Sequence, residues 1–281
     1  MNCIGIIGAG NIGSSLAHNL LLYNKKIVLV DISDEILEQS KEKIKKDIRF
    51  TNLYVKSKDK INTKELLNNI TFTTDLNQLE NVDFVVENVT EDWNIKKDIY
   101  KKIDKICPPD VCFGVNTSCI SITKVAAITN RSDKVIGCHF MNPVYLKEYV
   151  EVIKGYYTSE ETINTITSFF DEIQKKAIII NDFPGFVSNR ISHLFMNEAV
   201  FTVQDGTATP EQVDMVFKKC FNHKMGPLET ADLIGLDTVY KSLLVLYESY
   251  RDSKYRPAPL LEKMVYAGLL GVKTGKGFYN Y

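Results

Sequence analysis

Two features of the sequence predict an α/β fold with a mainly parallel sheet, followed by an all-α region. Short runs of β-branched residues alternate with longer amphipathic stretches up to about residue 181, and this alternation is typical of a parallel sheet covered on both faces. After Asp182-Phe183-Pro184-Gly185 the chain has long apolar periodicities without strand-like alternation, and Pro-Gly is a strong break in regular structure. We therefore expect an α/β domain over residues 1–183 and a helical domain over residues 184–281.

Short apolar runs bounded by turn-forming residues mark the expected strands of the first domain. They lie at residues 3–7, 26–30, 70–73, 82–87, 112–116, 134–140 and 150–154, and residues 177–181 are open to an eighth. Between them apolar residues recur at helical spacing, as at Ile36, Leu37, Ile44 and Ile48. In the second domain the same spacing predicts helices over about 186–203, 210–221, 228–250 and 259–267. The second of these helices has Thr209 as its N-cap and Pro210 in its first turn.

The composition excludes several kinds of partner. The 281 residues include 34 Lys and Arg against 35 Asp and Glu, so no strong net charge attracts nucleic acid or acidic lipid. No apolar run approaches the roughly 20 residues of a membrane-spanning helix, and no signal peptide precedes the first strand. The six cysteines show no C-x-x-C spacing, which predicts reduced thiols and no metal site. We expect a cytoplasmic protein that binds neither nucleic acid nor membrane.

A glycine-rich segment follows the first expected strand and opens the first helix. It reads Gly8-Ala9-Gly10-Asn11-Ile12-Gly13, a G-x-G-x-x-G motif. In a Rossmann-type domain the first glycine permits a tight turn, the second lets a pyrophosphate approach the backbone, and the third allows helix and strand to pack closely. We therefore expect Gly8, Gly10, Asn11, Ile12 and Gly13 to bind a dinucleotide.

Asp31 ends the second expected strand, 23 residues after Gly8. This is near the spacing of about 20 residues expected for an acid that binds the ribose of a dinucleotide. A carboxylate there accepts hydrogen bonds from both ribose hydroxyls and repels a 2′-phosphate, which favours NAD over NADP. FAD is also compatible with the motif, and the structural alternative is a glycine turn beside a helix-capping aspartate.

His139 ends the apolar run of residues 135–140, at the sheet edge where ligands bind in open α/β folds. Glu151 begins the following run, so two adjacent strands could bring its carboxylate against one imidazole nitrogen. When a hydride leaves a carbinol carbon for nicotinamide, the hydroxyl proton needs a base with a pKa near neutrality. A glutamate would fix the tautomer of that base and stabilise the imidazolium. On this pair alone, a structural histidine is the open alternative.

Further motifs follow one another along the whole chain. They are Val86-Glu87, Asn116-Thr117-Ser118, His139-Phe140 with Asn142-Pro143, Val150-Glu151-Val152-Ile153, Pro184-Gly185-Phe186-Val187 with Asn189-Arg190, Met225-Gly226-Pro227-Leu228-Glu229, Asp252-Ser253-Lys254-Tyr255-Arg256-Pro257 and Gly277-Phe278-Tyr279. In this order they resemble the 3-hydroxyacyl-CoA dehydrogenase family, especially its short bacterial 3-hydroxybutyryl-CoA members. The resemblance implies an enzyme that uses NAD to interconvert an (S)-3-hydroxyacyl-CoA thioester and its 3-oxo form.

The resemblance also implies roles for individual residues. His139 corresponds to the general base of the family and Glu151 to its charge partner. Ser118 corresponds to the serine that hydrogen-bonds the 3-oxygen of the substrate, and Asn189 to the asparagine that closes the site across the cleft. From the sequence alone, Ser118 could instead cap the helix that follows it, and Asn189 could be an ordinary surface amide.

Asn116 and Glu87 correspond to residues near the nicotinamide side of NAD, although Glu87 could also be an ordinary carboxylate at a strand end. The helical domain would supply Asn189 and a homodimer interface, because the helices expected at 228–250 and 259–267 carry more apolar residues than one sheet edge could cover.

The sequence departs from the family pattern on the expected path of CoA. Where relatives place a serine and a lysine that contact the CoA nucleotide, Asp47 and Tyr54 stand here, with Lys56 and Lys58 close by. An acid aimed at a 3′-phosphate would repel it. Beyond His139, Lys147 and Glu148 replace a methionine and a lysine of the usual pattern.

Two alternatives therefore stay open. The segments Glu87–Asp92 and Phe140–Pro143 also resemble the branch of the family that acts on acyl groups tethered to an acyl carrier protein in polyketide extender-unit assembly. A protein that kept the fold and the NAD site but lost catalysis is the alternative from another class; the presence of His139, Ser118, Glu151 and Asn189 argues against it.

Overall fold

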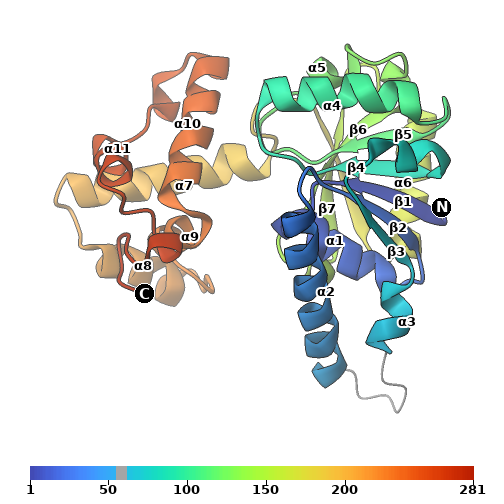
Figure 1. Ribbon diagram of the computed structural model, residues 1–281. Helices are drawn as coiled ribbons and strands as arrows, with labels where there is room; N and C mark the ends of the chain where they lie inside the picture. Colours follow the sequence, from blue (N-terminus) through green and yellow to red (C-terminus); the bar gives the residue numbers. More distant parts are fainter. Residues whose placement is uncertain (55–61) are drawn as a thin grey trace. The chain divides into compact units, whose positions relative to one another are not determined.

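The apolar runs of the first 182 residues form one eight-stranded sheet in the computed structural model, which describes residues 1–54 and 62–281 (Figure 1). The strand order is β3-β2-β1-β4-β5-β6-β7-β8. The strands are β1 (Cys3–Ile7), β2 (Lys26–Val30), β3 (Ile70–Thr73), β4 (Phe84–Glu87), β5 (Cys112–Val115), β6 (Val135–His139), β7 (Tyr149–Lys154) and β8 (Lys176–Asn181). Neighbouring strands are parallel except β6 and β7. The predicted mainly parallel α/β sheet is confirmed, and the segment left open at 177–181 is a strand.

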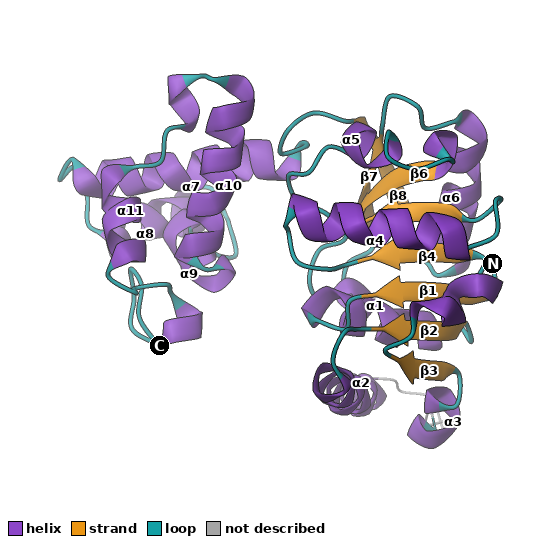
Figure 2. Ribbon diagram, turned by 45° about the horizontal axis from the view of Figure 1, so that its top comes forward, coloured by secondary structure: helices purple, strands orange, loops and turns teal. Residues whose placement is uncertain are grey.

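Helices cover both faces of the sheet, which is why its central strands β4, β5 and β6 are buried at every residue. The helices of this part are α1 (Asn11–Leu21), α2 (Asp34–Tyr54), α3 (Thr63–Leu67), α4 (Trp93–Ile106), α5 (Ile122–Ala126) and α6 (Glu160–Glu172). Figure 2 shows α4 on one face of the sheet and α1 on the other. The change of face occurs between β1 and β4, so the crevice at the carboxyl ends of these strands is the expected ligand position.

The chain divides into two compact units, Met1–Asp182 and Phe183–Tyr281. The second unit is helical, with α7 (Ser188–Gln204), α8 (Pro210–Cys220), α9 (Pro227–Ile234), α10 (Leu236–Tyr250) and α11 (Pro259–Tyr266). Its core includes Met196, Leu228, Leu243 and Leu261. Thr209 caps α8 as predicted, in a capping box with Gln212.

The single helix expected over residues 228–250 is wrong, because the chain breaks between α9 and α10 at Gly235. This glycine has φ +104, and a Cβ on it would lie 2.8 Å from Nζ of Lys273. The apolar spacing continues through the break, so the periodicity conceals it; the positive φ that glycine tolerates produces it. Among the described residues, no helix combines the length and the apolar character needed to cross a membrane.

Candidate active site

The glycine loop leaves β1 and opens α1 in the way its sequence predicts. Gly8 has φ +94, and a Cβ on Gly13 would lie 1.9 Å from the carbonyl oxygen of Gly8, so helix and loop pack too closely for a side chain there. A Cβ on Gly10 would meet no atom within 4 Å of the described structure. Gly10 is the N-cap of α1 and supplies no side-chain cap. Open space beside an uncapped helix N-terminus suits the pyrophosphate of a dinucleotide.

Asp31, directly after β2, lies against the glycine loop. Its Oδ2 accepts the N–H of Ala9 at 2.7 Å, and its Oδ1 accepts the N–H of Ile32 at 2.7 Å. The side chain predicted to bind ribose is thus tied to the same turn that the phosphates would occupy. Lys43 of α2 donates to Oδ1 of Asn11 at 3.0 Å, which adds a positive charge at the start of α1.

His139 and Glu151 contact each other through neighbouring strands. They are paired residues in the antiparallel register of β6 and β7, so their side chains lie on the same face of the sheet. Nδ1 of His139 lies 2.8 Å from Oε2 of Glu151, and the two residues are only 7% and 9% exposed. An ionised carboxylate can only accept hydrogen bonds, so Nδ1 carries the proton and Nε2 is left with the lone pair.

Ser118 lies beside that second nitrogen. Its Oγ is 3.3 Å from Nε2 of His139. The alternative that Ser118 caps the next helix is wrong, because the N-cap of α5 is Ser121, whose hydroxyl accepts the N–H of Lys124. Ser118 comes after β5 and His139 ends β6, and these strands are parallel neighbours, which explains why both side chains reach the same edge of the sheet.

These residues line a cavity of about 280 Å³ in the first unit. Its lining consists of Asn11, Ile12, Asn88, Val89, Glu91, Asn116, Thr117, Ser118, His139 and Phe140. The predicted catalytic histidine and serine and the predicted cofactor residues Asn11, Ile12 and Asn116 therefore share one site. The amide of Asn116 is fixed there: its Nδ2 donates to Asn88 at 2.9 Å, and its Oδ1 accepts the N–H of Phe140 at 3.2 Å.

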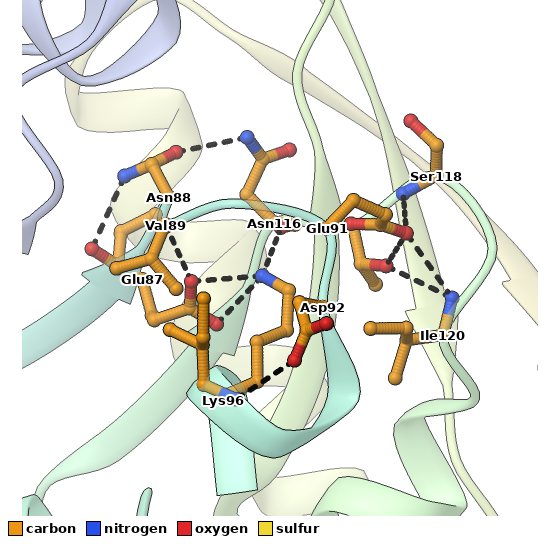
Figure 3. Close-up of polar contacts among 12 residues, drawn as sticks. Glu87, Asn88, Val89, Glu91, Asp92, Lys96, Asn116, Ser118 and Ile120 are labelled. Carbon is orange, nitrogen blue, oxygen red and sulfur yellow. Dashed lines mark hydrogen bonds and ion pairs between the residues drawn. The ribbon is translucent and has the colours of Figure 1, made fainter. Parts of the chain in front are cut away.

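Glu87 is not among the residues that line this cavity. Its side chain is wholly buried, and both of its oxygens accept hydrogen bonds from Nζ of Lys96, at 2.8 and 2.9 Å (Figure 3). Burial raises the pKa of the Glu87 carboxyl, and the ammonium of Lys96 opposes that shift. Lys96 also donates to the carbonyl of Asn116 at 3.0 Å. Glu87 therefore supports the loop of Asn116 through the ammonium of Lys96. An ordinary strand-end carboxylate would not form such a buried ion pair.

Glu91 lines the cavity although it lies outside the predicted site residues. It lies four positions after Glu87, which ends β4, and its carboxylate accepts the N–H of Ser118 (Figure 3). The available signal was its position: polar residues just past the carboxyl end of a parallel strand lie at the ligand edge.

Asn189 belongs to the second unit, near the start of α7. Its carbonyl oxygen lies 3.0 Å from Nδ1 of His193, four residues further along the helix. The closing of the site by its side chain stays a prediction.

The residues on the expected CoA path are only partly described. Lys56 and Lys58 lie outside the described residues, as does the side chain of Tyr54. Asp47 lines a second cavity of about 490 Å³ together with Lys46, Arg49, Phe50 and Tyr145. Burial raises the pKa of the Asp47 carboxyl, which makes the acid less readily ionised than a free one. Among residues 1–54 and 62–281 there is no cluster of three or more side chains suited to hold a metal ion.

Comparison with known proteins identifies both units. The family model of the 3-hydroxyacyl-CoA dehydrogenase NAD binding domain matches residues 3–183, and that of the 3-hydroxyacyl-CoA dehydrogenase C-terminal domain matches residues 185–281.

Individual relatives match along their whole length. The probable 3-hydroxybutyryl-CoA dehydrogenase of Deinococcus radiodurans is 44% identical over 99% of both chains. The protein of the same description from Bacillus subtilis is 42% identical over 99% of this chain and 96% of its own. The crystal structure of (S)-3-hydroxybutyryl-CoA dehydrogenase from Ralstonia eutropha superposes with a TM-score of 0.94 at 39% identity, covering 100% of this chain and 99% of that one. This chain belongs to the 3-hydroxyacyl-CoA dehydrogenase family.

Proposed function

We propose that this protein is an NAD-dependent oxidoreductase that interconverts an (S)-3-hydroxyacyl-CoA, with 3-hydroxybutyryl-CoA as the first substrate to test, and its 3-oxoacyl form. The observation that carries the proposal is the line of contacts from Glu151 through His139 to Ser118, which ends in the cavity beside the glycine loop. The CoA thioester and the (S) configuration in the proposal are taken from the names of the relatives.

The side chains account for the proton that the reaction releases. In the oxidation the O–H and C–H bonds at carbon 3 break, a C=O bond forms, and the proton passes to Nε2 of His139. Glu151 holds the proton on Nδ1 and stabilises the imidazolium that results. Ser118 orients the 3-oxygen through its hydroxyl, which lies close enough to bind the same atom as Nε2. NAD, when bound, supplies the acceptor of the hydride.

The glycine loop and Asp31 favour NAD as the dinucleotide. Gly10 leaves space for the pyrophosphate, and the carboxylate of Asp31, fixed by the N–H of Ala9, would repel the 2′-phosphate of NADP. The predicted proximity of Asn116 to the nicotinamide is supported by its place in the lining of the cavity.

A carrier-bound acyl group is the second candidate, because Asp47 stands in the cavity beside α2. Lys46 and Arg49 line the same cavity. Two positive side chains beside one acid give the cavity a net positive charge, which attracts a nucleotide phosphate. We therefore place CoA first.

One assay separates the candidates. NADH oxidation is measured at 340 nm with acetoacetyl-CoA and with an acetoacetyl-loaded acyl carrier protein. Turnover of the CoA thioester supports the proposal, turnover of the carrier substrate alone supports the second candidate, and turnover of neither, with NADH still bound, supports a protein that has lost catalysis.

We also propose that the protein is a homodimer. Apolar side chains that are more than half exposed lie on the second unit, among them Ile191, Met215, Phe221 and Leu233. A second copy of the chain would cover such a surface in a homodimer. Light scattering should then give twice the 31.9 kDa mass of the chain.

A location in the cytoplasm is proposed from the cysteines. All six are free thiols, which suits the reducing conditions of the cytoplasm.

A further inference from the structure

Glu91 holds the loop that carries Ser118. Four donors converge on its Oε1: the hydroxyl of Thr117 at 2.5 Å and the backbone N–H groups of Ser118, Cys119 and Ile120 at 3.1, 2.9 and 3.3 Å. The loop between β5 and α5 thus wraps around a single carboxylate oxygen that reaches it from the loop after β4.

This carboxylate accepts hydrogen bonds from backbone N–H groups that lie outside any helix or strand. Residues 117–120 form neither helix nor strand, so their N–H groups need acceptors from elsewhere. The hydroxyl of Thr117 also accepts the N–H groups of Cys119 and Ile120, at 3.4 and 2.9 Å, so Glu91 shares these two donors with it. Hydrogen bonds to a charged acceptor are the stronger ones, so removing the carboxylate would weaken the attachment of the backbone around Ser118.

Glu91 is itself fixed at both ends of its loop. The next residue, Asp92, caps α4 by accepting the N–H groups of Asn94 and Ile95 at 2.8 and 3.1 Å. On the other side, the buried pair of Glu87 and Lys96 binds the carbonyl of Asn116. The loop after β5 is therefore held at three places: by Asn88 at the side chain of Asn116, by Lys96 at the carbonyl of Asn116, and by Glu91 at Thr117–Ile120 (Figure 3).

We infer that Glu91 is a positioning residue, which sets the hydroxyl of Ser118 toward Nε2 of His139 by holding the Thr117–Ile120 turn. An oxygen that already accepts four hydrogen bonds has no lone pair left for a substrate, so this oxygen acts through the loop. The inference rests on the proposed function, in which the hydroxyl of Ser118 orients the 3-oxygen of the substrate.

The test is a double-mutant cycle of Glu91→Ala and Ser118→Ala, assayed with acetoacetyl-CoA and NADH. If Glu91 acts through Ser118, E91A lowers kcat by about 10- to 100-fold, since small misplacements of a reacting group have effects of this size. Ser118→Ala then costs much less in the E91A background than in the wild type, because coupled residues are non-additive. NADH binding, measured by fluorescence titration, stays within about twofold. E91Q, which keeps one neutral acceptor oxygen, should fall between E91A and the wild type, and it replaces E91A in the cycle if E91A does not fold.

The matched control is Glu80→Ala, an exposed acid of the same unit, which should leave kcat unchanged. Independent effects of E91A and S118A, or a kcat of E91A equal to that of the wild type, overturn the inference. A wild type without activity on any thioester contradicts the proposed function instead. In that case amide hydrogen exchange still decides: faster exchange at residues 118–120 in E91A supports the positioning role, and unchanged exchange overturns it.

Discussion

Glu151 faces His139 directly across β6 and β7, with 2.8 Å between Oε2 and Nδ1. This register is decisive because side chains alternate between the faces of a strand, so a slip by one residue would move the carboxylate to the opposite face. The antiparallel pairing of β7 with β6, an exception in this sheet, therefore brings together two residues that are twelve positions apart.

Replacing His139 by glutamine should lower kcat by roughly 100-fold or more, the range expected when a general base is lost. The ring that receives the proton is removed, while the glycine loop is unchanged, so NADH should bind as before. Stopped-flow turnover and NADH titration measure the two effects. Wild-type turnover in H139Q would remove His139 from the reaction.

Replacing Asp31 by alanine should weaken NAD binding and reduce the preference for NAD over NADP. The carboxylate that would repel a 2′-phosphate is then absent, and the N–H of Ala9 loses its acceptor. The ratio of kcat/KM with NADH to that with NADPH measures the change, with Glu35→Ala, an exposed acid in the first turn of α2, as the control. If the ratio is unaltered, another residue discriminates between the 2′-hydroxyl of NAD and the 2′-phosphate of NADP.

Replacing Gly13 by alanine should abolish dinucleotide binding and lower the melting temperature. The new Cβ would lie 1.9 Å from the backbone oxygen of Gly8, whereas a Cβ on Gly10 meets nothing within 4 Å. Gly10→Ala is therefore the matched variant: it should keep the melting temperature of the wild type and lose affinity for NADH, because its methyl group enters the space left for the pyrophosphate. Equal melting temperatures for both variants would contradict the packing argument.

His18 should make the protein less stable as the pH falls from 6.5 to 4. Burial lowers the pKa of this histidine from 6.5 to about 4, and its ring packs against Tyr145 at 4.5 Å between centroids. Between these pH values the unfolded chain binds a proton that the folded chain does not, so the free energy of unfolding declines as the pH falls. At pH 4 the titration of His18 lowers the free energy of unfolding by an amount on the order of 3 kcal/mol.

Urea unfolding of wild type and His18→Gln at pH 7, 6, 5 and 4 isolates this contribution from that of the carboxylates. The difference in unfolding free energy between the two proteins should shift in favour of the variant across this range. A constant difference would show that His18 titrates normally in the folded state.

Glu87 and Glu91 show where prediction from the sequence ended. Glu87 ends β4 and Glu91 follows it, and the family resemblance pointed to Glu87 as a residue near the nicotinamide. The structure buries Glu87 against Lys96 and directs Glu91 to the loop of Ser118. Local sequence does not distinguish two acids four residues apart, because their burial depends on Lys96 and on the turn at Thr117–Ile120, which come from other segments.

The sequence by itself determined the positions of the strands and of the glycine loop, and it placed Asp31, His139 and Glu151 at or near strand ends, because these features depend on short-range periodicity and on the G-x-G-x-x-G pattern. The tertiary structure alone decided the break at Gly235, the burial of Glu87 and the convergence of four donors on Glu91. The break depends on the backbone angle of one glycine, and the other two features depend on contacts with other segments of the chain; the apolar periodicity of a single segment records neither.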